Sequence, residues 1–91
     1  MNIERLRGAL KEGRLTISPL DDGSGVVLDV AGEQLLEMNA SALAMLQAVA
    51  DGAETEQAVA GRIAERFEAP GEQVAADVHT FFALLVASLK P

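Results

Sequence analysis

The stretch VVLDVAGEQLLEMN, residues 26–39, decides the fold of this 91-residue chain. Four of its first five residues are apolar and three are β-branched, which is typical of a strand. Ala31 and Gly32 then favour a tight turn, and Gln34–Met38 has the pattern of a returning strand. Asn39 is a good N-cap residue and precedes a segment with helical spacing. We therefore predict a β-hairpin that leads directly into a helix.

Successive side chains of a strand point to opposite faces of the sheet. In the returning strand, Leu36 and Met38 are therefore expected on one face, with Leu35 and Glu37 on the other.

The sequence before the hairpin predicts one more strand. Residues 15–18 form a short strand pattern that Pro19 ends, and residues 21–25 are dense in turn-forming side chains. Residues 1–13 place apolar side chains at helical spacing but contain two glycines, so a short helix and a frayed arm are both open. We divide the chain into this N-terminal segment and a folded domain over residues 14–91.

Three helices are predicted after the hairpin. The first runs from the Asn39 cap to about residue 50, the second follows a Thr55 cap, and the third begins at Pro70 and runs to about Leu89. In the second helix, the residues expected to face inward are Val59, Ile63 and Phe67. Three short antiparallel strands followed by three helices make an α+β fold that is similar to a winged helix-turn-helix.

The third predicted helix has a wider apolar face than one packing contact needs. Its expected core stripe comprises Val74, Val78, Phe81 and Leu85. Phe82, Leu84, Val86 and Leu89 widen the apolar arc to about 200°, against roughly 100° for one packing surface. Either the domain covers this helix on two sides, or part of the arc lines a groove for a partner or forms a dimer contact.

Composition excludes several classes of function. The chain has no cysteine and a single histidine, His79, so disulfides, thiolate chemistry and His-based triads have no basis. Its acidic residues lie mostly at helix starts and on exposed faces, and we predict neither catalysis nor a cofactor. The sequence contains no apolar run long enough to cross a membrane and no signal-peptide pattern, so a cytoplasmic protein is expected.

The charge balance argues against nucleic acid as a partner. Seven Lys and Arg residues are scattered among fourteen Asp and Glu residues, and the net charge is -7. Residues 74–89 of the third helix contain no Lys, Arg or Asn, the side chains with which a recognition helix reads DNA.

Several short motifs in a fixed order resemble one known family. They are Val27-Leu28-Asp29, Leu35-Leu36-Glu37-Met38-Asn39, Leu46, Asp51-Gly52, Thr55-Glu56-Gln57-Ala58-Val59, Ala64-Glu65-Arg66-Phe67, Gln73-Val74, Asp77-Val78, Phe81 and Leu85. Together they make the segment from about Leu15 to Leu89 similar to the PqqD-like family, also called precursor-peptide recognition domains or RiPP recognition elements.

The resemblance implies a non-catalytic, winged-helix-like module that binds the leader segment of a ribosomally made precursor peptide. Such modules present the peptide to a modifying enzyme, often a radical enzyme that uses S-adenosylmethionine. The leader adds as a strand to the third strand and packs against the third helix. The residues expected to bind it are Gln34, Leu35, Leu36, Glu37, Met38, Asp77, Val78, Phe81, Phe82 and Leu85.

The residues alone agree with this resemblance on two points. The strand Gln34–Met38 is an expected sheet edge with backbone groups free for strand addition, and the wide arc of the third helix supplies an apolar wall. On this arc Phe81 is expected in the core and Phe82 in the groove. We predict a monomer or weak homodimer. The alternatives are a winged-helix DNA-binding regulator and a structural dimerisation module.

Overall fold

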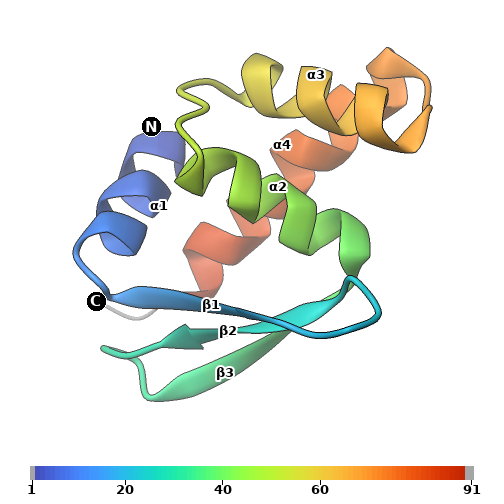
Figure 1. The fold of residues 1–91 in the computed structure, drawn as a ribbon. Helices are drawn as coiled ribbons and strands as arrows, with labels where there is room; N and C mark the ends of the chain where they lie inside the picture. The colour runs from blue at the N-terminus through green and yellow to red at the C-terminus, as the bar shows by residue number, and fades with distance from the viewer. Residues whose placement is uncertain (1, 90–91) are drawn as a thin grey trace.

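The computed structural model describes residues 2–89, so Met1, Lys90 and Pro91, at the ends of the two expected segments, lie outside the described residues. A three-stranded sheet forms one layer and helices cover one of its faces (Figure 1). The elements in chain order are α1 (Asn2–Lys11), β1 (Leu15–Pro19), β2 (Gly25–Asp29), β3 (Gln34–Met38), α2 (Ala40–Ala50), α3 (Glu56–Phe67) and α4 (Gly71–Ser88).

The sheet is antiparallel with strand order β1-β2-β3. In the register of β2 and β3, Val27 lies opposite Leu36 and Leu28 lies opposite Leu35. Val27 is fully buried against the helices, whereas Leu35 is 67% exposed on the other face. The predicted α+β order of three antiparallel strands followed by helices is confirmed, and so are the two faces of β3.

Side-chain caps begin two of the helices as predicted. Asn39 Oδ1 accepts a hydrogen bond from the Ala42 N–H at 2.8 Å, and Thr55 Oγ1 accepts one from the Ala58 N–H at 3.0 Å. Each cap satisfies a backbone donor that has no partner within its helix. Pro70 lies just before the first turn of α4 and is its N-cap residue.

Residues 2–11 form the helix α1, which settles the choice between a helix and an arm. Ile3, Leu6 and Ala9 are buried in the same core as the sheet and the other helices. α1 packs against β1, α2 and α4. The protein therefore has a fourth helix, and its first turns are held by apolar burial despite the glycine at position 8.

The core lies between the sheet and the helices, and α2 supplies much of it. Leu43, Leu46 and Val49 of α2 are buried together with Val59 and Ile63 of α3, as the helical spacing predicts. Phe67 was expected inward, but it lies at the end of α3 and is 40% exposed. The chain turns away there, because Glu68 adopts the left-handed conformation that ends the helix.

No helix within residues 2–89 is long and apolar enough to cross a membrane.

Candidate functional site

The strand β3 is an edge of the sheet, because it pairs with β2 on one side only. Along an antiparallel pair, residues alternately direct their backbone N–H and C=O groups toward the partner strand and away from it. Every second residue of β3 therefore turns these groups toward the free edge. They can pair with one further extended chain.

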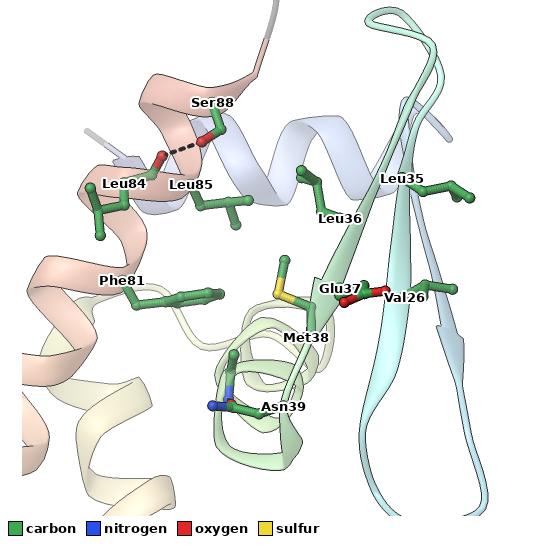
Figure 2. Close-up of a pocket in the computed structure, with 11 residues that line it drawn as sticks. Val26, Leu35, Leu36, Glu37, Met38, Asn39, Phe81, Leu84, Leu85 and Ser88 are labelled. Carbon is green, nitrogen blue, oxygen red and sulfur yellow. Dashed lines mark hydrogen bonds between the residues drawn. The ribbon is translucent and has the colours of Figure 1, made fainter.

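A groove of about 690 Å³ lies beside this edge, between β3 and the C-terminal half of α4. Figure 2 shows that the side chains of Leu36 and Met38, from β3, and of Phe81 and Leu85, from α4, point toward one another across the groove. These four side chains are apolar. The groove offers contact area to apolar side chains and hydrogen bonds to a backbone at its β3 side.

The groove also wraps around the edge of β3 onto the opposite face of the sheet. Leu35, Glu37 and Val26 lie on that outer side of the strand pair (Figure 2). A chain added to β3 would have alternate side chains on the two faces of the sheet. One set would enter the groove and the other would lie beside Leu35 and Glu37.

A hydrogen bond spans the groove at the end where β3 begins. The Gln34 side-chain amide donates to the Ser88 carbonyl oxygen at 2.8 Å and also to Asp29 Oδ2 at 2.9 Å. Asp29 is fully buried, and its Oδ1 also accepts the Gly32 N–H at 3.1 Å. The turn between β2 and β3 is thus tied through one carboxylate and one amide to the last residue of α4.

A second hollow, of about 360 Å³, lies next to the other end of the groove. Asn39, Ala42 and Phe81 line both the groove and this hollow, so the two are neighbours that share a wall. The residues that line the second hollow alone are Ser41, Met45, Ile63, Phe67, Ala69, Val74 and Asp77. Most of them are apolar, and Asp77 is an exposed carboxylate.

The structure brings most of the expected binding residues together, but two of them lie in the core and have no place on the groove. Leu36, Met38, Phe81 and Leu85 point into the groove (Figure 2). Gln34 spans its end, Leu35 and Glu37 line its outer side, and Asp77 lines the second hollow. Val78 and Phe82 have no exposed surface and lie in the core.

The expected roles of the two neighbouring phenylalanines are therefore reversed. Phe82 is fully buried, whereas Phe81 is half-buried and lines the groove. The buried stripe of α4 follows four-residue steps from Val74 to Val78 to Phe82, which rotates it away from Phe81. α4 packs against α1 as well as α3. The sequence did not decide whether residues 1–13 form a helix, so it could not show which side of α4 faces the core.

Leu84 is a groove residue that sequence reasoning did not single out for binding. It is 64% exposed and lies beside Leu85 along the groove (Figure 2). The sequence did contain a signal for Leu84, because this residue lies at one margin of the wide apolar arc of the helix. An apolar side chain at that margin that makes no core contact faces solvent or a partner.

Charge is sparse inside the groove. Of the described residues that line it, Glu37 is the one with an ionisable side chain. No group of three or more His, Cys, Asp or Glu side chains that could hold a metal ion occurs within residues 2–89.

His79 Nδ1 lies 2.8 Å from Glu56 Oε1 and links α4 to α3 at the surface. The apolar groove beside the free edge of β3 is suited to binding an extended chain.

A free sheet edge beside an apolar groove is the arrangement through which strand-addition modules hold extended peptides. Residues 24–88, from just before β2 to the last residue of α4, match the family model described as Coenzyme PQQ synthesis protein D (PqqD). The chain belongs to the PqqD family, whose members are non-catalytic peptide-binding partners of biosynthetic enzymes. Neither the curated proteins nor the solved structures gave a match.

Proposed function

We propose that this protein binds the leader segment of a ribosomally made precursor peptide by strand addition to β3 and presents the peptide to a modifying enzyme in the cytoplasm. The observation that carries the proposal is the free edge of Gln34–Met38 beside the apolar groove. Membership of the PqqD family supports it.

In this proposal the two sides of the groove supply different parts of the binding free energy. The β3 backbone gives sequence-independent hydrogen bonds to the leader. Leu36, Met38 and Phe81 select apolar side chains at alternate leader positions, because those positions face the part of the groove between β3 and α4. Specificity therefore comes from the side-chain pattern of the leader.

The chemistry of modification belongs to the partner enzyme, for which we propose a radical enzyme that uses S-adenosylmethionine. The role of this chain is to hold the leader, so that the segment to be modified extends from the groove toward the enzyme. Holding two reactants together raises their effective concentration, and a non-catalytic module can accelerate modification in this way.

An amide chemical-shift titration of isotope-labelled protein tests the proposal. The titrant is a synthetic leader of a short precursor encoded beside the gene, and we expect changes concentrated in Gln34–Met38 and residues 81–88. Leaders that are N-methylated at every second residue provide the matched control. N-methylation in one alternation should abolish binding and in the other should preserve it, because only alternate amides face β3.

Three outcomes would contradict the proposal. Equal effects of both N-methylated leaders would exclude strand addition. Concentration-dependent changes on α4 without any peptide would favour a structural dimerisation module. Tight, strongly salt-dependent binding to duplex DNA would favour a DNA-binding regulator.

A further inference from the structure

The second hollow lies where an extended peptide on β3 would continue. The groove has two ends, and the hydrogen bond from Gln34 to the Ser88 carbonyl spans the one at the start of β3. At the other end Asn39 and Phe81 line both the groove and the second hollow, so the hollow lies next to this end. Among the described residues, a leader longer than the five residues of β3 therefore finds a lined hollow beyond Met38.

The sheet itself indicates which part of the leader would follow this path. Both strand pairs are antiparallel, and an added strand of the same sense would run antiparallel to β3. The N-terminal side of the paired leader segment would then lie at Met38, beside the entrance to the second hollow.

The walls of the second hollow define the chemistry of the occupant. Met45, Ile63 and Val74 are buried beneath it, and Phe67, 40% exposed, and Phe81 flank it. Its 360 Å³ is enough for one large apolar side chain and its neighbours on the chain. Asp77 is exposed at this hollow in a chain of net charge -7, which favours a positive charge beside the apolar group.

We propose that the second hollow is an anchor subsite for one large apolar side chain of the leader, located N-terminal to the segment that pairs with β3. Asp77 favours a Lys or Arg next to that anchor. This inference rests on the proposed function, and it adds a specificity element that β3 does not supply. Leaders that share the paired segment but lack the anchor bind more weakly.

Two synthetic peptides and one cavity-filling variant test the subsite. One peptide is the whole leader, and the other lacks all residues N-terminal to the paired segment. Ala69→Phe places a bulky side chain at a half-buried position that lines the second hollow alone. It should weaken binding of the whole leader by about tenfold, as expected for losing the burial of one apolar side chain, and leave the truncated leader unaffected.

Leu84→Ala is the matched control, because Leu84 lines the groove and not the second hollow. It should weaken both peptides by the same factor. Asp77→Lys should weaken only a leader that carries a basic residue beside the anchor. Amide spectra of each free variant establish that it is folded.

The outcomes separate the subsite from the proposed function. If neither peptide changes the amide signals of Gln34–Met38, the proposed function fails. If both peptides change those signals with equal affinity, and neither moves the signals of Phe67, Ala69 and Val74, the subsite alone is overturned. An anchor that maps C-terminal to the paired segment would also overturn the inference.

Discussion

The side-chain amide of Gln34 donates a hydrogen bond to the Ser88 carbonyl, 54 residues away, at 2.8 Å. It joins the start of β3 to the end of α4, the two elements that form the groove, while the same nitrogen also bonds Asp29. One side chain therefore bridges the two walls of the groove at this end, and its contribution can be measured.

Gln34→Ala should lower the free energy of unfolding by about 1–2 kcal/mol, because it removes both hydrogen bonds and takes one donor from the buried Asp29 carboxylate. Urea denaturation measures the loss. Ser88→Ala is the control, since it keeps the backbone carbonyl and removes only a hydroxyl bonded to the Leu84 carbonyl. A loss in Gln34→Ala no larger than that in Ser88→Ala would show that the two hydrogen bonds of Gln34 together add no stability.

Phe81 and Phe82 offer a matched pair of truncations. Phe82→Ala should destabilise the fold by about 3–5 kcal/mol, because it opens a cavity at a side chain with no exposed surface. Phe81→Ala should cost less stability and weaken leader binding, since this ring lines the groove and the second hollow. Urea denaturation and peptide titration measure the two effects. A larger stability loss for Phe81→Ala would contradict the burial described above.

Two glycines should respond to alanine in opposite directions. A Cβ at Gly32 would lie 2.5 Å from Asp29 Oδ2, so Gly32→Ala must displace the carboxylate that holds the β2–β3 turn. Gly61 lies in the middle of α3 with nothing within 4 Å of a Cβ, and Gly61→Ala should stabilise by about 1 kcal/mol. Thermal unfolding compares them, and a stabilised Gly32→Ala variant would contradict the close approach.

The turn between β1 and β2 contains a carboxyl group with a perturbed pKa. The Ser24 hydroxyl, and after it the Ser24 backbone N–H, lower the pKa of Asp22 from its ordinary value of 3.8. A lowered folded-state pKa stabilises the fold above the unfolded-state pKa, and this contribution disappears as the pH falls through the folded-state value. Ser24→Ala should raise the pKa of Asp22, as followed by carboxyl NMR titration, and an unchanged pKa would assign the effect to the backbone.

Local sequence signals placed the strands and helices well, because each depends on nearby residues. The bounds of β3 and the caps Asn39 and Thr55 needed only side-chain alternation and short hydrogen bonds. Predicting how α4 is rotated about its own axis requires knowledge of every element that packs on it. Phe81 and Phe82 are adjacent, and the helical wheel alone could not tell which one the core would take.

The hydrogen bond across the groove could not be predicted from the sequence either. Gln34 is an ordinary strand residue in the sequence, and its partner is a backbone carbonyl that any residue at position 88 would provide. No composition or spacing marks such a pair. The second hollow was equally hidden, since its walls come from α2, α3, α4 and the segment between the last two.

The free edge of β3 has a consequence for the protein in the absence of its peptide. An unpaired strand is a template for any extended chain, including the β3 of another copy or of a partly unfolded neighbour. Leu35, 67% exposed, makes such aggregation more favourable, whereas Glu37 opposes it because charged side chains on an edge discourage promiscuous pairing. Glu37 therefore has the position and the charge of a gatekeeper residue, which opposes pairing of the vacant edge with other copies of the chain.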